Sequence, residues 1–167
     1  MEVEKVENPF QITLLSSEQE KTKRQAFSEL LRNSPIPQTE LLTQLGLFMK
    51  RQSLSRVLFL RDLYTQILEV HGVVFDLGTR WGQNMALFQN FRGIYEPHNL
   101  NRKIIGFDTF SGFPSVNEKD GVLQAGEFSV SGGYECFLNQ ILSYHESESP
   151  IAHIRKYEIV KGNAVET

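Results

Sequence analysis

The chain has 167 residues, of which 40% are hydrophobic and 22% are charged, as in an ordinary globular domain with a substantial core. The formal net charge of −3 argues against nucleic acid or an anionic membrane as the main partner. A single cysteine excludes an internal disulfide framework. The first residues lack a signal-peptide core, and no apolar run approaches membrane-spanning length, so we expect a cytoplasmic protein.

The N-terminal part of the chain is predicted to be helical. Ser17 and Glu20 have the spacing of a capping box, which predicts a helix over 17–31. Two prolines then interrupt the chain. Helical spacing of apolar residues predicts a second helix over 39–51 and a third over 53–71.

Three short apolar runs, at 73–77, 103–108 and 157–161, are predicted to be strands. A helix is expected over 84–91 and a loop over 93–101, between the first two strands. Strands separated by such crossovers form a parallel sheet. The second crossover has the clearest helical period in the chain, formed by Tyr134, Phe137, Leu138, Ile141 and Leu142.

Acids, amides and glycines follow the predicted strands. The first strand leads into the pattern Asp76-x-Gly78-x-x-x-Gly82, the second ends at Asp108, and the third is followed by Asn163. Because the carboxyl ends of parallel strands meet at one edge of a sheet, we expect a ligand crevice there. The glycine pattern differs from the Gly-x-Gly-x-x-Gly of dinucleotide enzymes.

These strand ends, together with the segments 106–114 and 162–167, resemble class I S-adenosylmethionine (SAM) dependent methyltransferases. More narrowly, they resemble the macrocin O-methyltransferase type, which methylates sugar hydroxyls of natural products with help from a magnesium ion. The likeness runs from about Leu54 to the last residue. It implies an α/β fold with a Rossmann-like parallel sheet and flanking helices, and SAM as the cofactor.

The resemblance also implies roles for single residues. In the family the first glycine-rich turn packs against the methionine part of SAM. The resemblance implies this role for Asp76, Gly78 and Gly82. In the family the acid that ends the second strand binds the ribose of SAM, and the resemblance implies this role for Asp108. The adenine contact is usually an aspartate, and Asn163 stands at that position. The remaining predicted cofactor-binding residues are neighbours of these in sequence: Thr79, Arg80, Thr109, Phe110 and Ala164.

Each of these residues also has a simpler explanation. The glycines could make a tight turn in any α/β protein, and Asp108 or Asn163 could accept hydrogen bonds from turn amides. Arg80 could clamp the methionine carboxylate or an acidic substrate, or be an exposed loop arginine. Phe110 and Phe113 could wall the adenosine pocket or anchor the loop.

The resemblance stops short of the family's metal site. The magnesium ligands of the family follow its fourth strand, whereas this sequence ends at Thr167, just past the third. We therefore expect the Mg²⁺ ligands to be absent from this chain and interpret it as an N-terminal portion. Residues 1–70 are predicted to be a helical lid or oligomerisation region, and 71–167 half of a SAM-binding domain of about three strands. An exposed sheet edge favours a homo-oligomer.

The favoured function is methyl transfer from SAM to a hydroxyl of a sugar or other small-molecule acceptor. The chain would supply the SAM-binding part, and we expect no activity from it alone. A non-catalytic SAM-binding or assembly module is the alternative. A nucleotide-dependent oxidoreductase is less favoured, because the dinucleotide glycine pattern is missing.

Overall fold

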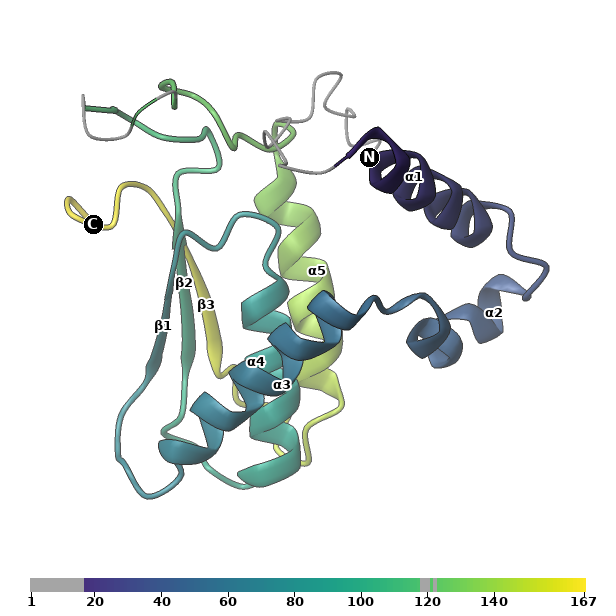
Figure 1. The fold of residues 1–167 in the computed structure, drawn as a ribbon. Coiled ribbons are helices and arrows are strands. Elements are labelled where there is room, and N and C mark those ends of the chain that lie inside the picture. Colours follow the sequence, from purple (N-terminus) through teal and green to yellow (C-terminus); the bar gives the residue numbers. More distant parts are fainter. Residues whose placement is uncertain (1–16, 118–120, 122) are drawn as a thin grey trace. The chain divides into compact units, whose positions relative to one another are not determined.

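The computed structural model describes residues 17–117, 121 and 123–167. By its internal contacts this part of the chain forms two units, one up to Arg56 and one from Val57 to Thr167 (Figure 1). No helix in the described ranges is both long and apolar enough to cross a membrane. The predicted domain boundary at residue 70 stays a prediction.

The first unit opens with the predicted capping box. Helix α1 (Glu18–Arg32) begins after Ser17, whose hydroxyl accepts a hydrogen bond from the Glu20 amide at 3.3 Å. The Glu20 carboxylate accepts in return from the Ser17 amide at 2.9 Å. This exchange satisfies two amide groups that the first turn of a helix leaves without partners.

The predicted helix over 39–51 is wrong in part. A short α2 (Gln38–Leu41) starts directly after Pro37 and continues as a 3₁₀ helix, η1 (Leu42–Phe48). Proline fixes a φ angle that suits the position before a helix, and Gly46 lowers helix propensity within η1. None of the described side chains in α1, α2 or η1 is buried.

Helix α3 (Arg51–Gln66) crosses from the first unit into the second. It ends five residues earlier than the sequence predicts, and an irregular turn leads from it to the sheet. Its C-terminal half buries Leu60 and Tyr64, whose side chains are 8% and 1% exposed.

The second unit is built on three parallel strands, β1 (Val74–Leu77), β2 (Ile104–Asp108) and β3 (Tyr157–Lys161). They are hydrogen-bonded in the order β1-β2-β3 (Figure 1). Asp76 lies opposite Gly106, and Asp108 lies opposite Lys161. The predicted fold class is confirmed: a partial Rossmann-like α/β arrangement with flanking helices.

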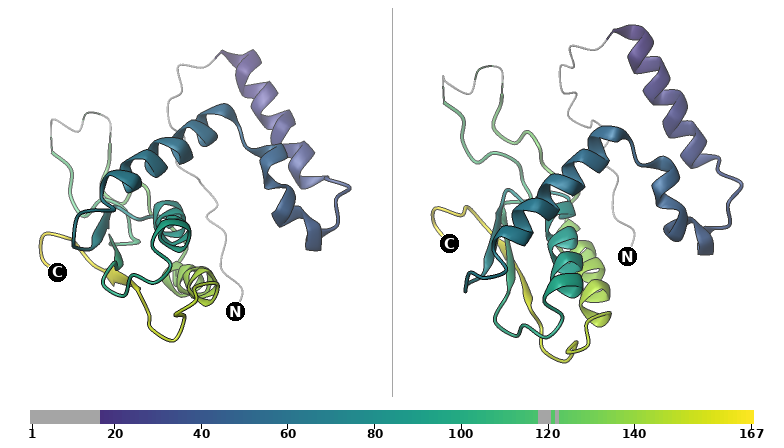
Figure 2. Two further views of the ribbon diagram at one scale, coloured as in Figure 1. Left: turned by 90° about the horizontal axis from the view of Figure 1, so that it is seen from below. Right: turned by 60° about the horizontal axis from the view of Figure 1, so that its bottom comes forward.

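Helices α4 (Gln83–Tyr95) and α5 (Tyr134–Ser147) lie against the same face of the sheet (Figure 2). The loop predicted from residue 93 begins later, because 93–95 continue α4. Tyr95 extends the helical period and stacks on Tyr64 of α3, with 6.5 Å between ring centroids. The best-buried apolar side chains between helices and sheet are Met85, Ile104, Leu138 and Leu142.

The opposite face of the sheet is apolar and exposed. Phe75 and Leu77 of β1 alternate with the inward-facing residues and are 59% and 67% exposed. The Phe75 ring meets Phe107 of β2 edge-on at 5.5 Å. Within the described residues no helix packs on this side, which we call the open face (Phe75, Leu77 and Phe107). Parallel sheets are normally covered on both faces.

A buried ionic cluster joins α4, α5 and the start of β3. One carboxylate oxygen of Glu146 lies 2.8 Å from Arg92 Nη2 and 2.7 Å from Lys156 Nζ. The other oxygen accepts a hydrogen bond from the Lys156 amide at 3.1 Å. The three residues are at most 4% exposed. Such a cluster is favourable only when all its members are present, because each charge has lost its hydration.

A second charged cluster fixes the turn after α4. Glu96 accepts hydrogen bonds from Arg102 Nε at 3.0 Å and from the Tyr64 hydroxyl at 2.7 Å. Arg102 also donates to backbone carbonyls after α3, among them that of Ile67 at 2.8 Å. Burial alone would raise the pKa of the Glu96 carboxyl, but hydrogen bonds from Arg102, Tyr64 and Asn99 outweigh it, and the pKa lies below its ordinary value.

This pKa shift predicts an acid-dependent loss of stability. Glu96 contributes its full share above the pKa of an unfolded glutamate, about 4.3, and loses it as the pH falls through the lower folded value. Glu96→Gln is therefore expected to be less stable than the parent at neutral pH, with the gap narrowing in acid. Urea unfolding between pH 7 and pH 3 measures this gap, and a gap that stays constant would contradict the prediction.

Candidate functional site

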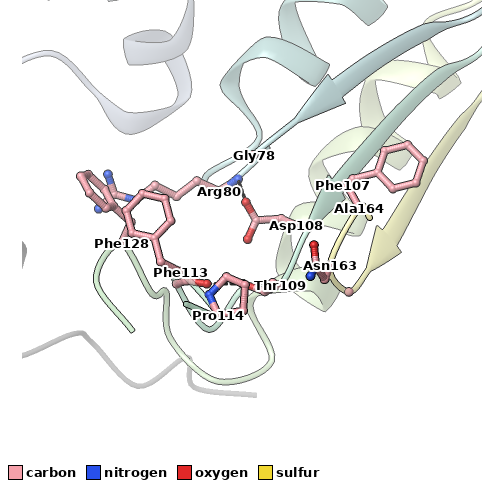
Figure 3. Close-up of a pocket in the computed structure, with 12 residues that line it drawn as sticks. Gly78, Arg80, Phe107, Asp108, Thr109, Phe113, Pro114, Phe128, Asn163 and Ala164 are labelled. Carbon is pink, nitrogen blue, oxygen red and sulfur yellow. Dashed lines mark hydrogen bonds between the residues drawn. The ribbon is translucent and has the colours of Figure 1, made fainter. Parts of the chain in front are cut away.

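A pocket of about 340 Å³ lies at the carboxyl ends of all three strands. Gly78 follows β1, Asp108 ends β2, and Gly162 follows β3, so each strand contributes to its wall (Figure 3). The residues that line it are Gly78, Arg80, Phe107, Asp108, Thr109, Gly112, Phe113, Pro114, Phe128, Gly162, Asn163 and Ala164. The structure thus brings six of the predicted cofactor-binding residues together: Gly78, Arg80, Asp108, Thr109, Asn163 and Ala164.

Asp108 connects the ends of two strands. Its Oδ2 atom accepts a hydrogen bond from the Arg80 amide at 2.7 Å (Figure 3). Its Oδ1 atom accepts one from the Phe110 amide at 2.6 Å. It therefore has the turn-stabilising role that the sequence left open as an alternative. A carboxylate oxygen has two acceptor positions, so each oxygen keeps one for a ligand.

The glycine-rich turn after β1 is held against β2. The amides of Gly78 and Thr79 donate to the carbonyl of Phe107 at 2.9 and 3.2 Å. Gly78 has a φ of 81°, and a Cβ atom there would have no neighbour within 4 Å. Its backbone therefore borders the pocket directly, without a side chain to fill the space.

Asp76 and Thr79 lie behind this turn and do not line the pocket. Asp76 is 6% exposed, and its Oδ1 atom accepts from Asn84 Nδ2 at 3.0 Å. Its Oδ2 atom is buried without a hydrogen-bond partner among the described residues. The Thr79 hydroxyl donates to the Asp76 carbonyl at 3.0 Å. Both residues therefore stabilise the turn from the side that faces away from the pocket.

Gly82 and Phe110 also lie outside the pocket lining. Gly82 caps α4 with a φ of 77°, and a Cβ atom there would overlap the side chain of Leu138 in α5. The close approach at Gly82 is thus made by a helix of the same chain. Phe110 is 6% exposed and has a φ of 57°, so it anchors the loop after β2.

An Asx turn at Asn163 stabilises the segment after β3. Asn163 Oδ1 accepts from the Val165 amide at 3.2 Å, and its Nδ2 donates to Glu166 at 3.3 Å. Asn163 still borders the pocket beside Ala164 (Figure 3). This geometry corresponds to the turn role that the sequence allowed for an Asn after a glycine.

Several pocket residues were not predicted. Phe107 lines the pocket at the end of β2, where the sequence predicted only the next residue, Asp108, as a site residue. Gly162 forms the pocket wall after β3. Gly112 and Pro114 belong to the segment on which the family resemblance rests, so their part was foreseeable. Phe128 follows a long polar stretch, and no local pattern marks it. Phe113, which the sequence offered as a wall, does line the pocket.

The two glycines of the turn are expected to respond differently to alanine. Gly82→Ala should lower the free energy of unfolding by about 2–4 kcal/mol, because a positive φ and overlap with Leu138 both oppose the methyl group. Gly78→Ala should cost about 1–2 kcal/mol, since only its φ opposes the substitution. Chemical denaturation of both variants tests this order, and equal losses would contradict it.

No group of three or more His, Cys, Asp or Glu side chains in residues 17–117, 121 and 123–167 could hold a metal ion. The resemblance implied that the Mg²⁺ ligands lie outside this chain, and that expectation stays a prediction. The described residues at the pocket do not fit a metal, because Asp108 is the one carboxylate among them.

No protein-family model matches the chain, and no curated protein sequence matches it. Solved structures do match it, and two of them are structures of CalS11. The crystal structure of CalS11, a calicheamicin methyltransferase, is 40% identical with a TM-score of 0.87, over 92% of this chain and 62% of that one. The second is the apo structure of CalS11, TDP-rhamnose 3′-O-methyltransferase, an enzyme in calicheamicin biosynthesis. It is 35% identical with a TM-score of 0.76, and the match covers 92% of this chain and 60% of that one. The chain spans about three fifths of these relatives and has a methyltransferase fold.

Proposed function

We propose that this chain is the SAM-binding part of an O-methyltransferase that acts on a hydroxyl of a sugar. The observation that carries the proposal is the pocket to which the ends of β1, β2 and β3 all contribute. Ligands of open α/β sheets bind at this edge. The likeness to CalS11, whose name specifies methylation of a TDP-linked rhamnose, supports a sugar as the acceptor.

The residues at the pocket fit the donor. Its volume of about 340 Å³ lies in the range of small-molecule sites. Asp108 has acceptor positions left for ribose hydroxyls, Gly78 leaves room for a close approach, and Asn163 presents an amide able to donate and accept. The rings of Phe113 and Phe128 provide apolar walls. The narrower assignment to the macrocin O-methyltransferase type is part of the same proposal.

The chain's contribution to the reaction is alignment. When bound, SAM supplies the methyl group on its sulfonium centre. Asp108 and the Gly78 turn would hold the donor in one orientation, and Phe113 and Phe128 would keep water from one side. The acceptor hydroxyl must lose its proton, and the one carboxylate in the pocket lining, Asp108, is engaged by two amides. We assign that step to groups beyond the described pocket.

Calorimetry tests donor binding directly. The chain is expected to bind SAM and S-adenosylhomocysteine and to give no heat with NAD⁺. Binding of NAD⁺ alone would defeat the proposal in favour of a nucleotide-dependent oxidoreductase.

A methyl-transfer assay separates an enzyme from a non-catalytic SAM-binding or assembly module. The open face and the three-fifths coverage of CalS11 favour a chain that is active only with a complement, that is, a further polypeptide segment that completes the fold. We expect no transfer from labelled SAM to TDP-rhamnose by this chain alone, with or without Mg²⁺. Transfer should appear when the C-terminal part of CalS11 is co-expressed with it, if the proposed activity is right.

A further inference from the structure

Arg80 has an unusual backbone for a residue with a long side chain. In the described part of the chain three residues other than glycine have a positive φ: Arg80 at 47°, Phe110 at 57° and Phe128 at 66°. This conformation is unfavourable for such residues and persists only where the surroundings fix it. At Arg80 the fixing contact is the hydrogen bond from its amide to Asp108. The turn therefore directs the Arg80 side chain along the pocket wall.

Two aromatic rings hold the Arg80 guanidinium. Its central carbon lies 4.8 Å from the ring centroid of Phe128, which Figure 3 shows beside it. The same carbon lies 5.5 Å from the ring centroid of Trp81. Trp81 is held in turn by Tyr134 of α5, whose ring meets it edge-on at 4.8 Å and whose hydroxyl donates to its carbonyl. Aromatic faces contact the flat face of a guanidinium and leave its N–H groups free for an acceptor.

The positive charge of Arg80 has no counter-ion among the described residues. Buried Arg92 and Arg102 each pair with a carboxylate, Glu146 and Glu96 respectively. Arg80 forms no ion pair with any described residue, and its Nε atom is buried without a hydrogen-bond partner there. A buried donor without a partner is costly, and because Arg80 lines the pocket, a ligand bound there would supply an acceptor for its guanidinium.

We propose that Arg80 binds an anionic oxygen group of the ligand in this pocket. The group is the carboxylate of the methionine part of SAM, or a phosphate of a nucleotide-linked acceptor. Both present oxygen pairs that match the fork of a guanidinium. The inference rests on the proposed function and adds the residue that distinguishes charged ligands from their neutral counterparts.

Pairs of ligands that differ in one anionic group test it. SAM and decarboxylated SAM differ in the carboxylate, and thymidine diphosphate and thymidine differ in the phosphates. Calorimetry with the parent, Arg80→Met and Arg80→Lys measures all four. Arg61→Met is the matched control, because Arg61 also lies over a ring, that of Tyr95, at 5.7 Å and does not line the pocket. Thermal unfolding establishes that each variant is folded.

Arg80→Met is expected to weaken binding of the anionic member of one pair by about 10- to 100-fold and its neutral partner by about 2-fold or less. Arg80→Lys should fall between, and Arg61→Met should match the parent. Discrimination in the SAM pair identifies the donor carboxylate, and discrimination in the thymidine pair identifies the acceptor phosphate. Equal losses within both pairs would overturn the inference. A parent chain that binds neither SAM nor decarboxylated SAM would instead refute the proposed function, and the thymidine pair would still decide on Arg80.

Discussion

Glu146→Gln is expected to lower the free energy of unfolding by about 3–5 kcal/mol. The carboxylate of Glu146 faces Arg92 at 2.8 Å and Lys156 at 2.7 Å, and all three side chains are buried. A neutral amide leaves two buried cations side by side, and its NH₂ group would also meet one of the donors that now surround the carboxylate. Urea unfolding followed by circular dichroism measures the loss.

Glu148→Gln is the control for this substitution. Glu148 lies two residues further along the chain and is exposed, so its replacement should change the unfolding free energy by less than about 0.5 kcal/mol. If the Glu146→Gln and Glu148→Gln variants unfolded at the same denaturant concentration, the buried cluster would have no part in holding α4, α5 and β3 together.

Asp108→Asn is expected to have the largest effect on the site. The side-chain amide can accept from one of the two backbone amides that Asp108 now serves, those of Arg80 and Phe110, and must point a donor at the other. One amide left without an acceptor should cost about 1–3 kcal/mol of stability. Because the turn after β1 is tied through this carboxylate, SAM affinity should fall at least about 10-fold, which calorimetry measures.

Asp62→Asn serves as the comparison, since Asp62 is an exposed residue on α3 whose partner, Arg61, is also on the surface. It should leave both stability and SAM affinity close to those of the parent. An Asp108→Asn chain that bound SAM as tightly as the parent would remove Asp108 from the donor site, whatever its stability.

The sequence was a good guide where local chemistry decides the structure. Apolar runs that end in an acid or a glycine predicted β1, β2 and β3, and the period around Leu138 predicted α5. The parallel direction of the strands followed from the helical crossovers between them. Because strand ends meet at one edge, the convergence of Gly78, Asp108 and Asn163 was also predictable.

The sequence was a poor guide where distant contacts decide. Gly93 suggested a loop, yet α4 continues through it because Tyr95 packs on Tyr64, 31 residues earlier in the chain. The role of Phe128 depends on its contact with Arg80, 48 positions away, which no local pattern reveals.

The open face has a consequence for how this chain would meet a complement. Among the described residues β1 is at one edge of the sheet and pairs only with β2, and Phe75 and Leu77 project from the same strand. An incoming strand would gain main-chain hydrogen bonds and apolar burial together. Recognition would then depend on alignment along the strand: a slip of one position would turn every incoming side chain to the wrong side.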